Sequence, residues 1–186
     1  MFRRNFIQGL CTLIPSAFIP KKEEEGCFFS GKSKIYFDEN KQHYKTIFES
    51  GEIRWFKDGV FHREDGPAII QPDGSVFWHQ NGKLHRVDGP AIERADDSRH
   101  WYQNGELHRV DGPAIEYLNG KKEWWIKGRL HRENGPAIEC PDGTRSWWRN
   151  GERHREDGPA VIHADGKQEW WFNGTRQIFV EPTLQT

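Results

Sequence analysis

One seven-residue motif occurs five times at a constant step of 23 residues, and this repetition constrains the fold more than any other feature. The motif reads His-Arg-Glu-Asp-Gly-Pro-Ala at 62–68 and 154–160, with close variants at 85–91, 108–114 and 131–137. A Gly at 59, 82, 105, 128, 151 and 174 keeps the same period, as does a second Gly at 51, 74, 120, 143 and 166 that Asp97 replaces once. Several positions in step, with no insertion, indicate a tandem array of one supersecondary unit.

Each unit carries the signals of a β-hairpin. In the unit at 89–111, residues 98–103 alternate around Trp101 and then meet Asn104-Gly105. Asn-Gly between two such runs predicts a two-residue turn, because both central residues need positive φ. Gly-Pro recurs too often for helices, and no 3.6-residue period is present. We therefore expect an all-β fold in which 23-residue hairpin repeats form an elongated antiparallel meander or an open, solenoid-like sheet.

Two aromatic ladders accompany the repeat. Hydrophobic residues make up only 34% of the chain, so a thin core must depend on its nine Trp. Adjacent strand residues face opposite sides, which predicts one Trp ladder on the face of Ile69, Ile92, Ile115, Ile138 and Val161, and a second ladder opposite. Because two ladders are hard to bury in a single layer, we expect exposed aromatic surface. The first ladder is Trp55, Trp78, Trp101, Trp124, Trp147 and Trp170, and the second is Phe56, His79, Tyr102, Trp125, Trp148 and Trp171.

The segment 81–85, Asn-Gly-Lys-Leu-His, preceded by Trp78 and followed by another Asp-Gly turn, resembles the MORN repeat. The resemblance covers residues 51–176 and is that of a divergent variant, because the family has Gly after the His. Here Arg63, Arg86, Arg109, Arg132 or Arg155 follows it. The resemblance implies an elongated sheet used for protein contacts, scaffolding or membrane-surface association. Bacterial variants of the repeat also occur in immunity or antitoxin-like proteins.

The two ends depart from the repeat. In residues 1–27, Arg3-Arg4 and the apolar run to Pro20 resemble a twin-arginine export signal. The alternative is a retained amphipathic helix over 2–14 that docks on the sheet, a partner or a membrane surface. We expect residues 28–50 to form a degenerate capping repeat, residues 51–176 to hold five to six repeats, and residues 177–186 to form a C-terminal cap. Three cysteines without metal spacing favour a reducing compartment, hence the cytoplasm, with export or membrane association through residues 1–20 as alternatives.

The repeated His-Arg pairs are the sharpest candidates for a site. Equivalent atoms of neighbouring repeats lie about 9–10 Å apart in such a sheet, too far to share one zinc ion. We therefore expect no metal, and a structural ladder in which each His or Arg bonds the Asp or Asn two or three residues later and fixes the turn. The alternative is an anion-binding row of arginines. The ladder is His62, His85, His108, His131 and His154 with Asp65, Asp88, Asp111, Asn134 and Asp157.

Catalysis requires an asymmetric set of groups, and nothing in the array is unique in that way. We expect no enzyme and no cofactor. The main hypothesis is a non-enzymatic protein-interaction module, such as a scaffold, an immunity or antitoxin-like protein, or an inhibitor of a partner protein. The alternative is a binder of an anion, a nucleotide or single-stranded nucleic acid through the arginines and Tyr102, Trp125, Trp148 and Trp171. The net charge of −1 and the glutamates at 93, 116 and 139 disfavour nucleic acid. The identity of the partner and the oligomeric state stay open.

Overall fold

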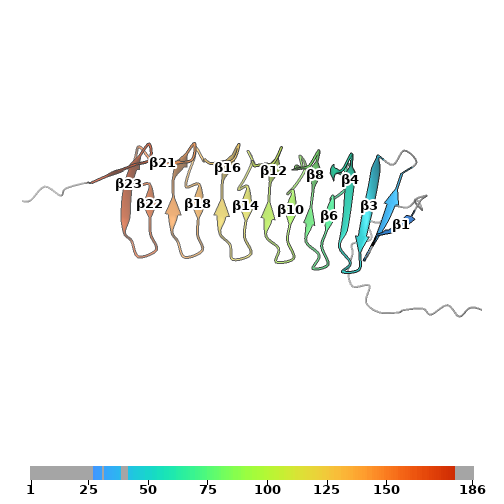
Figure 1. Ribbon diagram of the computed structural model, residues 1–186. Coiled ribbons are helices and arrows are strands. Elements are labelled where there is room, and N and C mark those ends of the chain that lie inside the picture. Colours follow the sequence, from blue (N-terminus) through green and yellow to red (C-terminus); the bar gives the residue numbers. More distant parts are fainter. Residues whose placement is uncertain (1–26, 31, 39–41, 179–186) are drawn as a thin grey trace, which may run out of the picture.

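The computed structural model describes residues 27–30, 32–38 and 42–178 and shows an elongated ribbon of repeated units (Figure 1). Every regular element in this part of the chain is a β-strand, which confirms the predicted all-β class. None of the described residues belongs to a helix of the length and apolarity that crossing a membrane requires. The expected N-terminal helix and export signal lie outside the described residues.

Long strands form the N-terminal end of the sheet. They are β1 (Cys27–Ser30), β2 (Ser33–Phe37), β3 (His43–Phe48) and β4 (Ile53–Lys57), and each pairs antiparallel with the next. The short β5 (Val60–Phe61) folds back on the end of β4. Tyr44 stacks on Phe56 with ring centroids 4.7 Å apart, and Phe56 stacks on Phe61 at 4.9 Å. The described residues of 28–50 therefore continue the sheet of the array.

Beyond β5, each repeat supplies very short strands at two levels. At the first level, two strands per repeat join one long antiparallel sheet in the order β1-β2-β3-β4-β6-β7-β10-β11-β14-β15-β18-β19-β22-β23-β24. These strands are β6 (Ile69–Ile70), β7 (Val76–Phe77), β10 (Ile92–Glu93), β11 (Arg99–His100), β14 (Ile115–Glu116), β15 (Lys122–Glu123), β18 (Ile138–Glu139), β19 (Arg145–Ser146), β22 (Val161–Ile162), β23 (Gln168–Phe172) and β24 (Thr175–Gln177).

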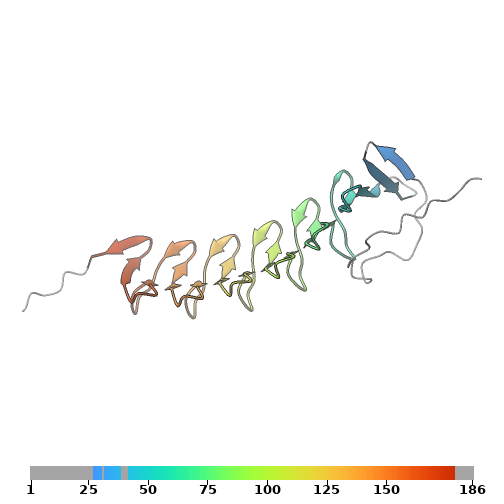
Figure 2. The ribbon, with the colours of Figure 1, turned by 90° about the horizontal axis from the view of Figure 1, so that it is seen from below.

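At the second level, two further strands per repeat form a separate hairpin. Figure 2, seen from below, shows the same unit recurring along a gently curved row. The hairpins are β8 (His79–Gln80) with β9 (Lys83–Leu84), β12 (Tyr102–Gln103) with β13 (Glu106–Leu107), β16 (Trp125–Ile126) with β17 (Arg129–Leu130), and β20 (Trp148–Arg149) with β21 (Glu152–Arg153).

The hairpin turns follow from their residues. Asn104 and Gly105 have φ of 53° and 87°, and Asn81 and Gly82 have 49° and 77°. Asn and Gly tolerate these angles, and the pair of positive φ values matches the twist of the flanking strands. The Asn-Gly turns predicted from the sequence are thereby confirmed. Lys127 holds the same conformation at 48°.

The repeated Trp separates the two levels. The backbone N–H of Trp78 donates to the carbonyl of Ala91 in the next repeat at 2.8 Å, and the carbonyl of Trp78 accepts from His85 N–H at 3.0 Å. Its backbone therefore bonds the long sheet on one side and its own hairpin on the other. Trp101, Trp124 and Trp147 repeat this pattern. The chain changes direction at each Trp, which is why one predicted strand over 98–103 is two strands in the structure.

The expected grouping of the ladders is wrong. Ile92 pairs with Phe77 and His100, the residues just before the Trp, so the row of Ile92 has the opposite parity from the Trp. Trp78 packs instead with Ile70, Val76 and Ala91. The error lies in the assumed register between strands, because the partner of Ile92 is His100 and not Trp101.

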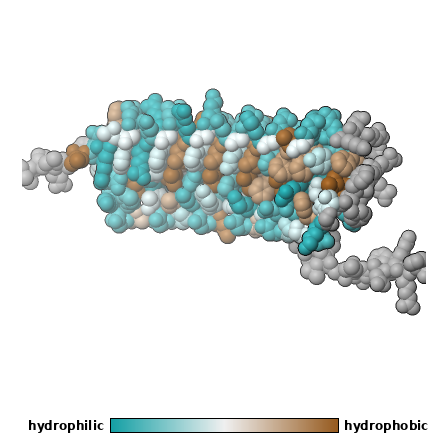
Figure 3. Space-filling model, in the orientation of Figure 1, coloured by the Kyte–Doolittle hydropathy of each residue, from teal (hydrophilic) through white to brown (hydrophobic). Residues whose placement is uncertain are grey.

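The core is thin, as the composition predicts. Ala68, Ala91, Ala114, Ala137 and Ala160, the last residues of the repeated motif, are all fully buried. The row Glu93, Arg99, Glu116, Lys122, Glu139 and Arg145 alternates in charge across the strands. Opposite charges on paired strands stabilise the sheet where no apolar layer covers it. Figure 3 shows apolar side chains in stripes over the middle of the sheet, with hydrophilic side chains along both long edges.

Candidate interaction surface

Each repeated Arg lies against the Trp of its own repeat. The Cζ atoms of the arginines are 3.8–4.2 Å from the Trp ring centroids, within the range of a cation–π contact. A Cβ placed on Gly89 would lie 2.9 Å from Cζ of Arg86, so the Gly backbone approaches the guanidinium closely. Arg86 is therefore held between Trp78 and Gly89, which accounts for the Gly of the motif. The pairs are Trp55 with Arg63, Trp78 with Arg86, Trp101 with Arg109, Trp124 with Arg132, and Trp147 with Arg155.

Hydrogen bonds fix the edge of each guanidinium. Nε of Arg86 donates to Oδ1 of Asp88 at 3.0 Å, and Nη1 donates to the Pro90 carbonyl at 3.3 Å and to Glu93 at 2.9 Å. Arg63, Arg109 and Arg155 bond Asp65, Asp111 and Asp157 in the same way. These bonds lower the pKa of all four Asp carboxyls below the usual value. Arg132 bonds Pro136 and Glu139.

The repeated His residues connect neighbouring repeats. Nδ1 of His62 accepts the backbone N–H of Asn81 at 3.1 Å, and Nδ1 of His108 accepts that of Lys127 at 3.2 Å. His85, His131 and His154 make the same bond to Asn104, Asn150 and Asn173. A His in one repeat thus closes the hairpin turn of the next. Metal ligation would compete with this bond for Nδ1, and no group of three metal-ligating side chains occurs among the described residues.

In addition to the Arg and His rows, a row of exposed side chains runs along the array, and we call it the loop ridge. It consists of the two residues after each repeated Arg, and all of them are exposed. The side chain of Asp88 is 84% exposed although Oδ1 accepts from Arg86. Val87 and Val110 are 79% and 82% exposed, among the most exposed large apolar residues described. The ridge is 64–65, 87–88, 110–111, 133–134 and 156–157.

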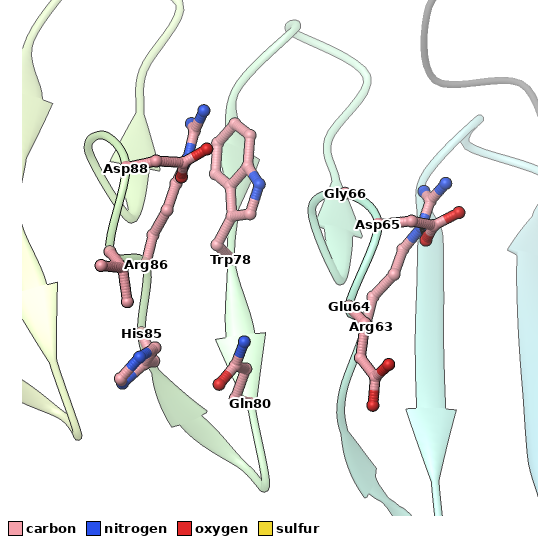
Figure 4. A pocket seen from close by; sticks show the side chains of 10 residues that line it. Arg63, Glu64, Asp65, Gly66, Trp78, Gln80, His85, Arg86 and Asp88 are labelled. Carbon is pink, nitrogen blue, oxygen red and sulfur yellow. Dashed lines mark hydrogen bonds and ion pairs between the residues drawn. The ribbon is translucent and has the colours of Figure 1, made fainter.

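A cleft of about 330 Å³ lies between the first two loops of the ridge. Arg63, Glu64 and Asp65 line one side, and Arg86, Val87 and Asp88 line the other. Figure 4 shows the Trp78 indole standing between these two loops. Three carboxylates, two arginines and Val87 therefore surround Trp78, which is only 9% exposed and carries Arg86 on one ring face. Because the carboxylates outnumber the arginines, the cleft favours a side chain with an apolar stem and a positive end.

The second aromatic ladder is half-buried, so the expected exposed aromatic surface is smaller than the sequence suggested. Nε1 of Trp125 donates to Glu123 at 2.9 Å, and Nε1 of Trp148 donates to Ser146 at 2.7 Å. Nε1 of Trp171 donates to Glu169 at 3.0 Å. These bonds hold the indoles against the sheet. Tyr102 packs beside the Trp78 cluster.

Cys140 shows no sign of a reactive thiol. It is half-buried, and burial raises the pKa of its thiol above the usual value. A raised thiol pKa lowers the thiolate fraction at neutral pH, and the thiolate is the nucleophile. Cys140 is therefore a poor nucleophile.

Sequence reasoning named the arginines and aromatics as binding residues and missed Val87 and Val110. The structure brings each Arg onto a Trp and leaves the next residue in solvent. The sequence contains a signal for this site, because the residue after each repeated Arg varies. It is Glu64, Val87, Val110, Glu133 and Glu156 in successive repeats. Apart from Asn134 in place of Asp, the rest of the motif is constant. Variation at a single position of such a motif is typical of a side chain that the fold does not require.

No protein-family model matches the sequence, and no curated protein matches it either. The resemblance to the MORN repeat therefore depends on the repeated residues alone.

Proposed function

We propose that this chain is a non-enzymatic protein-interaction module that contacts a partner protein through the loop ridge. The observation that supports it is the pair Val87 and Val110, which stand in neighbouring repeats and face solvent. Exposed valines gain nothing for the fold, and neighbouring exposed apolar side chains with polar surroundings are typical of protein contact sites. A scaffold, an immunity or antitoxin-like protein, and an inhibitor all use such a surface.

We place the contact surface on the ridge and not on the arginines, because each Arg already has partners within the chain. Each guanidinium has a Trp ring on one face, and its Nε or Nη1 atoms bond carboxylates or carbonyls of the same chain. An anion would have to displace these internal partners. The ridge side chains can meet a partner with no rearrangement of the fold.

Affinity capture with mass spectrometry tests the proposal. Tagged wild-type protein is compared with Val87→Ser/Val110→Ser, and Val60→Ser serves as the matched control because Val60 is a 45% exposed valine of β5, outside the ridge. We expect a protein that the wild type and the control both capture and that the double variant loses. Equal capture of every protein by all three would contradict the proposal.

A further inference from the structure

Building on the proposed function, we propose that the loop ridge binds an extended cationic segment of a partner protein, in polyproline II conformation, with Lys or Arg at every third residue. Three independent features of the ridge support this partner: its charge per repeat, its spacing, and the apolar side chains between the charges.

The charge of the ridge repeats with the fold. Every repeat exposes at least one carboxylate on the ridge, whereas its Arg lies beneath, against the Trp. For example, the side chain of Asp88 is 84% exposed and that of Arg86 only 23%. In the fifth repeat Arg149 reaches Glu156 at 3.3 Å and offsets part of this charge. The exposed carboxylates are Glu64, Asp65, Asp88, Asp111, Glu133, Glu156 and Asp157.

The spacing of this charge selects the conformation of the partner. Each repeat adds two strands to the long sheet, so equivalent carboxylates lie about 9.6 Å apart. A polyproline II helix advances about 9.3 Å in three residues and returns to the same direction. A β-strand advances about 9.9 Å in three residues but points the third side chain to the opposite face. Seven residues of an α-helix advance about 10.5 Å, so its charges drift out of step by about 1 Å per repeat.

Apolar contacts between the charges suit the same ligand. Val87 and Val110 stand between the acidic positions, and the cleft beside Val87 has Trp78 as a wall. Proline rings and the methylene stems of Lys or Arg pack on such surfaces. The carboxylates at the rim then face the cationic ends.

Fluorescence anisotropy with synthetic peptides tests the spacing on the wild-type protein. The probes are (Lys-Pro-Pro)4, (Lys-Pro-Pro-Pro)4 with the same charge at a four-residue spacing, and (Glu-Pro-Pro)4. We expect the first to bind at least about tenfold more tightly than the second, with an affinity that falls as salt rises, and the acidic peptide not to bind. Equal affinity for the two lysine peptides, or no binding by either, would overturn the inference.

A variant then locates the binding site. Asp65→Asn/Asp88→Asn/Asp111→Asn removes three charges and keeps Oδ1 for the Arg, and the fourth repeat already carries Asn134 at this position. We expect at least about a tenfold loss of (Lys-Pro-Pro)4 affinity with little change in melting temperature. If this variant unfolds, Glu64→Gln/Glu133→Gln replaces it, because both side chains are highly exposed. Unchanged affinity in a folded variant would overturn the inference.

The outcomes separate the two proposals. Failure of the peptide to bind, together with a captured protein that the Val87→Ser/Val110→Ser variant loses, overturns the cationic partner and leaves the interaction surface standing. If neither experiment gives the expected result, both the cationic partner and the interaction surface are overturned.

Discussion

Nδ1 of His62 accepts the backbone N–H of Asn81, 19 residues further along the chain, at 3.1 Å. The same bond recurs at every step of the array, so each repeat holds the turn of its successor. Only a His that has no proton on Nδ1 can accept it. Coupling between nearest neighbours is how repeat proteins gain stability beyond that of the single unit.

Replacing the His by Phe tests this coupling. His62 is 7% exposed, so His62→Phe leaves the N–H of Asn81 without an acceptor in a part-buried place and should lower the free energy of unfolding by about 1–3 kcal/mol. His108→Phe is the control, because water can reach the N–H of Lys127 there, and it should cost less than about 1 kcal/mol. Chemical denaturation measures both. No loss in His62→Phe would show that the bond is unimportant, and equal losses in both variants would show that burial does not set its contribution.

Gly89→Ala tests the sandwich around Arg86. The added Cβ would lie 2.9 Å from Cζ of Arg86, and we expect a loss of about 1–3 kcal/mol through displacement of the guanidinium. In an Arg86→Ala background the same change should cost almost nothing, because the clashing atom is gone. A double-mutant cycle measures this interaction. Additive losses would mean that Gly89 is needed for its backbone and not for the Arg.

The pH dependence of stability follows from His100. Burial, with a smaller contribution from Arg94, lowers the pKa of His100 from 6.5, and burial also lowers that of His79. Well above pH 6.5, His100 and His79 are neutral in both the folded and the unfolded chain. As pH falls below 6.5 the unfolded chain takes up protons that the folded chain does not, so the free energy of unfolding decreases.

His100→Ser, which copies Ser146 of the equivalent position, should make this decrease shallower. Denaturation between pH 7.5 and pH 5 measures the slope for both proteins. The difference should persist in high salt, because salt does not screen a desolvation effect as it screens exposed charges. Identical slopes would contradict the assignment.

The local chemistry of the repeat predicted much of this fold. Asn104-Gly105 correctly predicted a hairpin turn, and the fixed step of 23 residues correctly predicted the tandem antiparallel array. Local patterns did not predict the second level, because the bend at Trp101 depends on a bond to Ala114 in the following repeat. The grouping of Trp101 with Ile92 failed because local patterns do not show the register between strands, which pairs Ile92 with His100.

The site was harder to predict because its contacts cross the repeat. The stacking of Arg86 on Trp78 joins residues on opposite sides of a hairpin, and no spacing rule for strands anticipates it. Because Arg86 is held against Trp78, the residue that faces solvent is its neighbour Val87. A sequence shows which residue varies, but the direction of its side chain required the structure.

Hydrogen exchange on the complex with the captured partner measures the central claim most directly, because it reports which backbone amides the partner covers. We predict that added protection concentrates in the loops at 62–66, 85–89 and 108–112, and that the hairpins β12–β13 and β16–β17 exchange as in the unbound protein. Protection confined to those hairpins, with the loops unchanged, would contradict the assignment of the loop ridge as the interaction surface.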